Sequence, residues 1–246
     1  MTLSLMRFGT NYGGFVYPKN LPGLNENSVI YCVGVGEDIS HDILVSYITK
    51  APIFLFDPTL RSIVHVNEVK SVLDSGIEPP YNSRLGGGAQ DYWKLILDHP
   101  ISSDNIFFSP IGLYTENVAN MKFYKPNNPE YVSHSLVEKM KSDEYTIVPV
   151  KTLKSLMSDC NHDHIDLLKI DIEGVECEVL AQMLDANILP MYVSVDFDSA
   201  RGPTTNLSKC ENIVQRMLKA GYEILHFHMW DISFIHSSNS FFRVEK

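Results

Sequence analysis

The sequence predicts an α/β fold: a mostly parallel sheet with helices on both faces and an antiparallel hairpin at the end of the chain. Apolar runs of strand length alternate with helical periodicity through most of the 246 residues, which is typical of a parallel sheet flanked by helices. The last two apolar runs follow each other closely, so they are expected to pair antiparallel. The length suits one domain over 1–246, with 1–28 as an N-terminal extension.

Five apolar runs are predicted to form the parallel strands, in the ranges 29–35, 52–57, 106–108, 165–171 and 191–195. Helices are expected where apolar residues recur with helical spacing, near 39–48, 61–73, 175–183 and 207–218. Gly221 follows the last of these helices and is expected to end it in the left-handed conformation. Short edge strands are expected within 121–150, and the hairpin in 223–229 and 232–244, with a turn at 237–239.

The stretch 74–104 breaks this alternation. It holds Pro79-Pro80 and three consecutive glycines at 86–88, and long connections in compact domains are usually functional loops or disordered. We therefore predict a mobile insertion with one helix around Trp93, able to act as a lid. The alternative is a surface loop held by a packed aromatic anchor.

The charge balance and the cysteines exclude several classes of protein. Thirty acidic and 20 basic residues give a net charge of −10, so the chain lacks the basic surface that nucleic acids and anionic membranes require. The four cysteines form no C-x-x-C pair, which argues against a thiolate zinc site and a disulfide framework and favours a reducing setting. No signal peptide is recognisable, and no apolar run approaches the ~18 residues of a membrane span. A soluble, cytoplasmic protein is expected.

The first candidate site is the turn Gly34-Val-Gly36-Glu37-Asp38, at the end of the first predicted strand. Glycine lets the backbone approach a ligand, and the next helix offers free N–H groups at its start. Ile39 stands where a dinucleotide fingerprint has its third glycine, and the two acidic residues would repel a pyrophosphate. The turn therefore favours a ligand with positive charge and no phosphate. A tight turn without a ligand is the alternative.

Asp57 closes the second predicted strand, 21 positions after Gly36. A carboxylate at this position can accept two hydrogen bonds from a ribose diol. The alternative is a helix N-cap, because Asp57-Pro58 resembles a cap followed by proline at the first helical position.

Lys169, Asp171 and Glu173 alternate at the end of the fourth predicted strand, so they would line one side of it. Three charges at the end of a buried strand need a physical reason. One is a carboxylate placed at a cofactor. The other is a self-neutralised ion cluster at the start of the next helix, whose first turn carries further glutamates.

Asp196 and Asp198 follow the fifth predicted strand, and His226, His228 and Asp231 lie in the terminal hairpin. By alternation, the first two aspartates share a side, and so do the two histidines. Carboxylates with imidazole can bind a divalent ion or act as a general base. The alternative is that these are ordinary polar residues at strand ends.

Taken together, the sequence resembles the FkbM-type family of class I methyltransferases that depend on S-adenosylmethionine (SAM). The resemblance is carried by the segments 12–16 (YGGFV), 33–40 (VGVGEDIS), 56–59 (FDPT), 168–176 (LKIDIEGVE) and 226–228 (HFH). The block Lys-Ile-Asp-Ile-Glu-Gly after Phe-Asp-Pro is its most specific part.

The resemblance implies a Rossmann-like methyltransferase sheet with SAM above the ends of its strands. Gly34 and Gly36 would face the methionine part of SAM, Asp57 the ribose, and the loop 109–112 with Ile111 and Gly112 the adenine. Asp171 would lie near the sulfonium and the acceptor. Cys32 stands where many class I enzymes have an acid, so Glu37 or Asp38 would replace that acid at the cofactor amino group.

The family's usual acceptor is an alcohol oxygen, which implies O-methylation of a sugar hydroxyl on a glycan or small molecule. Asp171, Asp196 and His228 are expected to converge and remove the acceptor proton. Asp171, Asp196 and Asp198 are candidate ligands for a divalent ion, and the lid would offer Tyr81, Tyr92 and Trp93 for a sugar to stack on. The alternatives are a metal-dependent glycosyltransferase using Asp196 and Asp198, or a non-catalytic SAM-binding module. The oligomeric state does not follow from the sequence.

Overall fold

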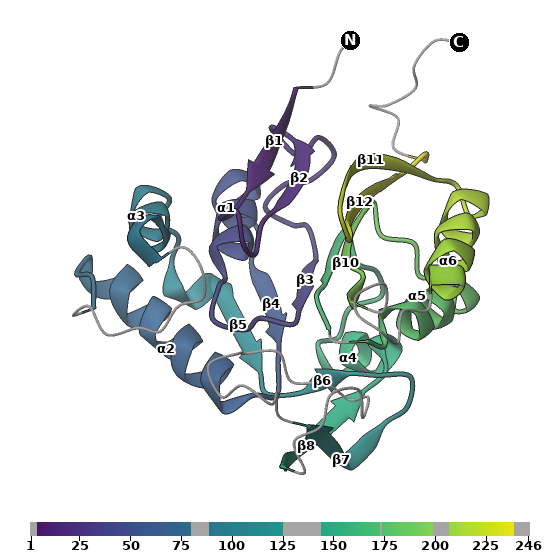
Figure 1. Cartoon of the computed structure of the whole chain (residues 1–246). Helices are drawn as coiled ribbons and strands as arrows, with labels where there is room; N and C mark the ends of the chain where they lie inside the picture. The colour runs from purple at the N-terminus through teal and green to yellow at the C-terminus, as the bar shows by residue number, and fades with distance from the viewer. Residues whose placement is uncertain (1–3, 80–88, 125–143, 173, 199–206, 239–246) are drawn as a thin grey trace.

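A seven-stranded sheet forms the centre of the protein (Figure 1). The computed structural model describes residues 4–79, 89–124, 144–172, 174–198 and 207–238. The strand order is β11-β12-β10-β9-β3-β4-β5, with β3 (Ile30–Val33), β4 (Ile53–Phe56), β5 (Ile106–Ser109), β9 (Leu167–Ile170), β10 (Tyr192–Asp196), β11 (Tyr222–His228) and β12 (Asp231–His236). The five strands from β10 to β5 are parallel, and β12 is antiparallel to both of its neighbours. The predicted fold class is confirmed.

Two hydrophobic cores lie on the two faces of this sheet, because successive strand residues point to opposite sides. In β3, Ile30 and Cys32 belong to one core, and Tyr31 and Val33 to the other. The first core is covered by the hairpin β1 (Leu5–Phe8) and β2 (Phe15–Pro18) and by α1 (Ser40–Thr49), α2 (Leu60–Ser75) and α3 (Ala89–Asp98). The second is covered by α4 (Leu153–Asp159), α5 (Glu176–Asp185) and α6 (Leu207–Lys219), on the other side in Figure 1.

The strands expected within 121–150 form a sheet of their own instead of extending the central one. Its order is β6-β8-β7, with β6 (Gly112–Leu113), β7 (Val118–Tyr124) and β8 (Tyr145–Lys151). It lies at the bottom of Figure 1. Residues 125–143, between β7 and β8, lie outside the described ranges.

The helix ends agree with the expected chemistry in one place and differ in another. Gly221 has a φ of +98° and its N–H bonds the Leu218 carbonyl after α6 ends, as predicted. The N-cap of α2, however, is Thr59, whose side chain accepts a hydrogen bond from the Ser62 N–H. The capping alternative for Asp57 was therefore wrong by two residues.

The terminal hairpin pairs as expected, and its turn falls between the two predicted runs. Met229, with a φ of +54°, lies in the turn between β11 and β12. The second strand ends at His236. Ser237 and Ser238 then form a turn, within the expected range 237–239. Residues 239–246 lie outside the described residues.

The stretch 74–104 contains α3 and a 3₁₀ turn, Ser103–Asn105, while Tyr81 and the glycines at 86–88 lie outside the described residues. Tyr92 and Trp93 are only 2% and 7% exposed and pack into the core. The expectation that these two rings stack on a sugar was wrong, because α3 uses its apolar face to bind α1 and α2. They are the aromatic anchor of the alternative interpretation.

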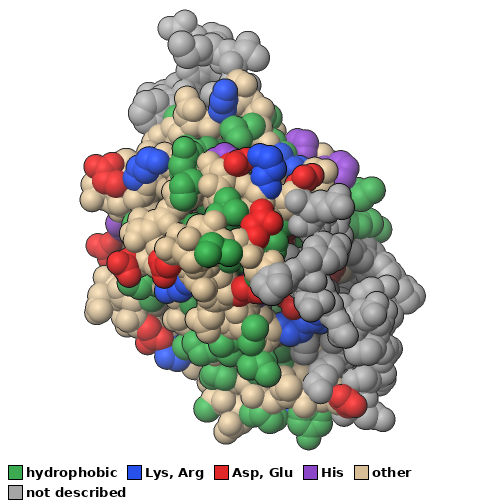
Figure 2. All heavy atoms as spheres, turned by 90° about the vertical axis from the view of Figure 1, so that its left-hand side faces the viewer, with side chains coloured by type: hydrophobic (Ala, Val, Ile, Leu, Met, Phe, Trp, Pro, Cys, Tyr) green, Lys and Arg blue, Asp and Glu red, His purple; other side chains and the backbone are tan. Residues whose placement is uncertain are grey.

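The outer surface carries mixed charges. Figure 2 shows the side that carries α2 and α3, where the described acidic and basic side chains are interspersed. No helix in the described part of the chain combines the length and the apolar character needed to cross a bilayer.

A buried histidine joins α2 to α3. His65 Nε2 lies 2.7 Å from the Tyr92 hydroxyl, which also accepts a hydrogen bond from the Ile39 N–H at 3.3 Å. Burial lowers the pKa of His65 from 6.5 to about 4. Glu68 lies 3.9 Å from Nδ1, but it is one-third exposed and does not offset the desolvation. His65 is therefore neutral in the folded protein at pH 7.

This lowered pKa predicts a loss of stability in mild acid. Between pH 6.5 and 4 the unfolded chain binds a proton that the folded chain does not, so the free energy of unfolding falls as the pH falls. From pH 7 to pH 5 the His65 contribution is about 2 kcal/mol. Urea unfolding at both pH values should show a pH dependence smaller by this amount in His65→Gln. An equal pH dependence in the variant would contradict the assignment.

Candidate functional site

A pocket opens at the carboxyl ends of β3, β4 and β9, where open α/β sheets bind their ligands. It gathers seven of the predicted cofactor residues: Gly34, Gly36, Glu37, Asp38, Asp57, Gly112 and Asp171. Apolar side chains complete the wall: Val33, Phe56, Leu113, Phe123, Val150, Ile172 and Val175. Tyr12 and Gly13 enter from the loop between β1 and β2.

The glycine turn has two distinct reasons for its glycines. Gly34 has a φ of +77°, and a Cβ there would lie 1.6 Å from the Asp171 carbonyl oxygen, so the backbone after β9 requires it. Gly36 has a φ of +56°, and a Cβ there would meet nothing within 4 Å. Gly36 therefore leaves open space on the pocket side, which is the cradle that a closely bound ligand requires.

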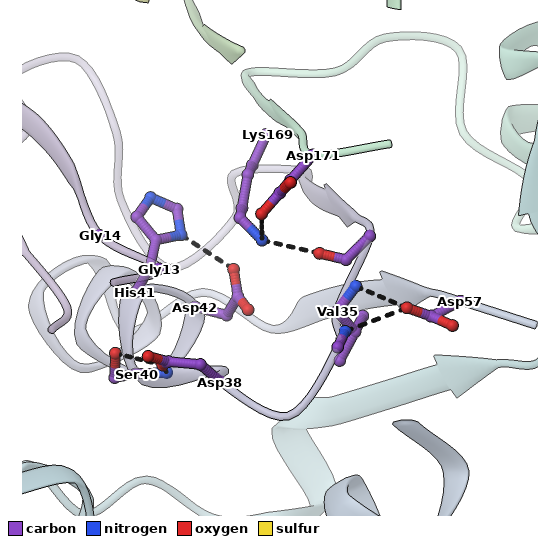
Figure 3. A network of polar contacts seen from close by, with 12 residues as sticks. Gly13, Gly14, Val35, Asp38, Ser40, His41, Asp42, Asp57, Lys169 and Asp171 are labelled. Carbon is purple, nitrogen blue, oxygen red and sulfur yellow. Dashed lines mark hydrogen bonds and ion pairs between the residues drawn. The ribbon is translucent and has the colours of Figure 1, made fainter. Parts of the chain in front are cut away.

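Asp57 shapes this turn (Figure 3). Its Oδ2 accepts hydrogen bonds from the N–H groups of Val35 and Gly36, at 2.9 and 3.0 Å. Its Oδ1 accepts from the Thr59 N–H and hydroxyl, at 2.8 and 2.7 Å. All four acceptor positions of the carboxylate are thus used within the protein. Binding of a ribose by Asp57 stays a prediction, and it requires Thr59 to release or share Oδ1.

The two acidic residues after the turn also have partners. Glu37 forms a two-pronged ion pair with Arg61, both contacts at 3.0 Å. Asp38 Oδ1 accepts hydrogen bonds from the Ser40 N–H and hydroxyl at 2.9 and 2.6 Å, and Oδ2 accepts one from the Thr10 hydroxyl. Glu37 and Asp38 thus hold α2 and the N-terminal loop in place, and their binding to a cofactor amino group stays a prediction.

Lys169 places a positive charge directly behind the turn. Its side chain is 1% exposed, and its Nζ donates a hydrogen bond to the Gly34 carbonyl at 2.8 Å and lies 3.9 Å from Asp171 Oδ2, as Figure 3 shows. Burial disfavours the ammonium, but the negative charges of Asp42 and Asp171 outweigh it and raise the pKa of Lys169 above its usual range. Lys169 and Asp171 share one side of the strand end, as predicted; Glu173 lies outside the described residues.

A buried polar chain continues from Lys169. Asp42 is fully buried, and the charge of Lys169 and a hydrogen bond from His41 overcome its desolvation and lower its pKa. His41 Nδ1 lies 2.8 Å from Asp42 Oδ1, and its Nε2 lies 3.2 Å from the Tyr17 hydroxyl in β2. The chain thus links the pocket to the N-terminal hairpin.

Asp42, His41 and Cys32 have ligand atoms within 4.8 Å of one another, as a metal site requires. The ammonium of Lys169, however, already balances the negative charge of Asp42. A divalent ion would leave excess positive charge in a fully buried place. Within the described ranges, Asp171, Asp196 and Asp198 do not come together in such a group.

The three predicted catalytic residues lie in a row instead of converging. Asp171 and Asp196 follow neighbouring strands, Asp196 pairs with Asp231, and Asp231 pairs with His228. Three strand spacings of ~4.8 Å separate the backbone at His228 from the backbone at Asp171 by ~14 Å along the sheet. Among these four residues, Asp171 alone lines the pocket at the ends of β3, β4 and β9. We expected the three side chains to converge. They share one edge of the sheet instead, because β12 lies between β10 and β11.

Sequence reasoning misplaced one pocket residue and missed others. Ile111 packs against the core on the α4–α6 side and does not line the pocket. Phe123 and Val150 line it from the small sheet without any local signal in the sequence. Tyr12 belongs to the YGGFV segment, which was recognised but not given a role.

The arrangement predicts a high cost for removing Lys169. In Lys169→Met, Asp42 stays buried without a countercharge, and breaking a buried ion network costs roughly 3–5 kcal/mol. Adding Asp42→Asn should recover part of that loss. The exposed Lys94→Met, which breaks a surface pair with Asp98, serves as the control with a change below about 1 kcal/mol. Chemical denaturation measures all four proteins, and a small effect of Lys169→Met would contradict the network.

Comparison with known proteins agrees with this geometry. A family model described as the methyltransferase FkbM domain matches residues 16–224. Among curated proteins, none matches the chain significantly. The mostly parallel sheet, its antiparallel hairpin and the pocket at the strand ends are those of a Rossmann-like methyltransferase fold. Since the match spans most of the chain and includes the glycine turn, Asp57 and Asp171, the chain belongs to the FkbM methyltransferase family.

Proposed function

We propose that this methyltransferase transfers the methyl group of SAM to an alcohol oxygen, with a sugar hydroxyl as the acceptor. The observation that carries the proposal is the pocket at the ends of β3, β4 and β9, which brings the glycine turn together with Asp171. The family supports methyl transfer. The choice of acceptor rests on the resemblance to a family whose usual acceptors are alcohols.

The residues of the pocket fit SAM. Gly36 leaves space beside the turn, and Leu113 and Val150 form an apolar wall suited to a flat base. The N–H groups of Val35 and Gly36 are bonded to Asp57, so they are not offered to a phosphate. The side chain of Asp171 is 37% exposed and lines the pocket, so a ligand there can reach its carboxylate.

When bound, SAM supplies a methyl group on a positively charged sulfur. An alcohol is a poor nucleophile, so the protein must hold its oxygen in line with the methyl group and remove its proton. Asp171 is the residue that we assign to the proton, since it lines the pocket at a strand end. Lys169, 3.9 Å away, stabilises the ionised carboxylate. Held in the pocket, SAM would supply the methyl group to the acceptor oxygen and would be left as S-adenosylhomocysteine, while Asp171 would hold the acceptor proton.

Asp196 lies next to Asp171 along the sheet edge and is the second candidate for contact with the acceptor. His228 is two strands further and requires a movement of the hairpin to take part. A divalent ion bound between Asp171 and Asp196 is the second route to deprotonation. Loss of turnover in EDTA would show that deprotonation needs the divalent ion. Full turnover in EDTA would show that the Asp171 carboxylate accepts the proton without a metal.

The glycosyltransferase alternative finds no support in the family, which is a methyltransferase family. It needs Asp196 and Asp198 as a metal pair, and in the described residues neither belongs to a group of three or more side chains that could hold a metal ion. A non-catalytic SAM-binding module remains as an outcome of the experiments below.

Asp57 should control cofactor affinity through the turn. Asp57→Ala frees the N–H groups of Val35 and Gly36 and removes a charged partner, at a cost of about 1.5–3 kcal/mol, or roughly tenfold or more in the Kd of SAM. Calorimetry measures this change. An Asp57→Asn variant keeps the size of the side chain but presents an amide that cannot accept all four bonds, so it should also weaken binding. Unchanged affinity in both variants would defeat this assignment.

Asp171→Asn should cut turnover ~10²-fold or more while changing SAM affinity little. Release of S-adenosylhomocysteine is measured with a panel of glycans and glycosides as acceptors. Asp185→Asn, an exposed position on α5, is the matched control. His228→Ala in the same assay tests the far end of the row. Normal turnover in Asp171→Asn would remove that residue from the mechanism. If the wild-type protein binds SAM but no acceptor yields product, the result would favour the non-catalytic binding module.

A further inference from the structure

The loop between β1 and β2 forms a wall of the pocket, although it precedes the segment that the family model matches. Tyr12 and Gly13 line the pocket together with Asp38 and the glycine turn. The matched segment begins at residue 16. The match of the family model therefore does not cover this loop, although the segment 12–16 is among those that carry the resemblance.

The loop is fastened to the start of α1 by the side chain of Thr10. The Thr10 hydroxyl accepts hydrogen bonds from the N–H groups of Tyr12 and Gly13, both at 3.2 Å, and donates one to Asp38 Oδ2. The Thr10 N–H donates to the Ser40 hydroxyl at 2.9 Å. One threonine thus connects the loop backbone to Asp38 and Ser40, and Figure 3 shows the contact between Asp38 and Ser40.

Close packing leaves the loop little freedom at this point. The Asp38 carboxyl carbon lies 3.1 Å from where a Cβ of Gly13 would stand. The hairpin behind the loop is anchored as well, because the hydroxyl of Tyr17 in β2 contacts the buried His41 of α1. The position of Tyr12 is therefore set by contacts on both sides of the loop.

Tyr12 is 58% exposed, whereas the other aromatic side chains of the pocket lining, Phe56 and Phe123, are buried and half-buried. Tyr12 lines the same pocket as Asp38 and the glycine turn, and the next residue, Gly13, lies against the Asp38 carboxyl group. Aromatic faces attract cations by about 0.5–2 kcal/mol. An aromatic ring held here suits a ligand whose positive charge lies beside the turn.

We propose that the loop 9–14 is a second binding element for the methyl donor, in which Tyr12 offers its aromatic face to the sulfonium and Thr10 and Asp38 hold it there. This inference rests on the proposed use of SAM. It also gives Asp38 a positioning role through Thr10, in place of direct contact with the cofactor.

The proposal separates two ligands that differ by one charge. SAM carries a sulfonium cation, whereas S-adenosylhomocysteine has a neutral sulfur and lacks the methyl group. A ring that acts on the cation stabilises SAM more than S-adenosylhomocysteine. A ring that only covers the pocket affects both ligands alike.

The test is calorimetric titration of both ligands into wild-type protein, Tyr12→Leu, Tyr12→Phe and Thr10→Val. Tyr12→Leu should weaken SAM about fivefold and S-adenosylhomocysteine less than about twofold. Tyr12→Phe keeps the aromatic face and should bind both ligands like wild type. Thr10→Val should reproduce the selective loss of SAM affinity, and the double variant Thr10→Val/Tyr12→Leu should lose little more, since both changes act on one contact.

Matched controls come from β8, where Tyr145 and Thr146 are exposed and outside the pocket lining. Tyr145→Leu and Thr146→Val should leave both affinities unchanged. Thermal unfolding without ligand checks that each variant is folded. Unchanged SAM affinity in Tyr12→Leu, or an equal loss for both ligands, overturns the role of the loop and leaves the proposed function standing. Failure of the wild-type protein to bind either ligand overturns both.

Discussion

The buried ammonium of Lys169 is the charge on which the site depends. An ammonium inside a sheet is costly unless it is paired and hydrogen-bonded. Lys169 meets this need with the Gly34 carbonyl and with the charges of Asp42 and Asp171. Asp42 in turn holds His41, which contacts Tyr17 in the hairpin. One buried cation thereby connects β9, the turn after β3, α1 and the N-terminal hairpin.

The acidic residues around the pocket divide into two kinds. Asp57, Glu37 and Asp38 accept hydrogen bonds or ion pairs from the protein itself and so define the backbone of the turn and its neighbours. Asp171 is held near Lys169 but keeps more than a third of its side chain exposed. The first kind shapes the pocket, and the second lies partly exposed in its wall. The acidic residues of the motif thus have an architectural role within the protein.

The pocket is assembled from segments that lie far apart in the chain. The glycine turn, the strand end at Asp57, the small sheet with Phe123 and Val150, and the loop with Tyr12 each supply one wall. The parallel order of the central strands brings the first two together, since neighbouring parallel strands end at one edge. The other two walls come from elements outside the central sheet.

Local patterns in the sequence determined the parallel strands and the helices α1, α2, α5 and α6, together with the positions of the glycine turn, Asp57, Lys169 and Asp171, because alternation and helical spacing follow from the geometry of the chain itself. They did not indicate the hairpin of β1 and β2 or the helix α4. Tertiary structure decided what those residues do. Tyr92 and Trp93 became buried because α3 packs on α1 and α2, and His228 was kept from Asp171 by the strands β10 and β12 between their strands. Asp57 and Asp38 took partners within the protein, and the bond from Lys169 to Gly34 spans 135 positions of sequence. Such contacts depend on how distant segments meet, and no periodicity in the chain encodes them.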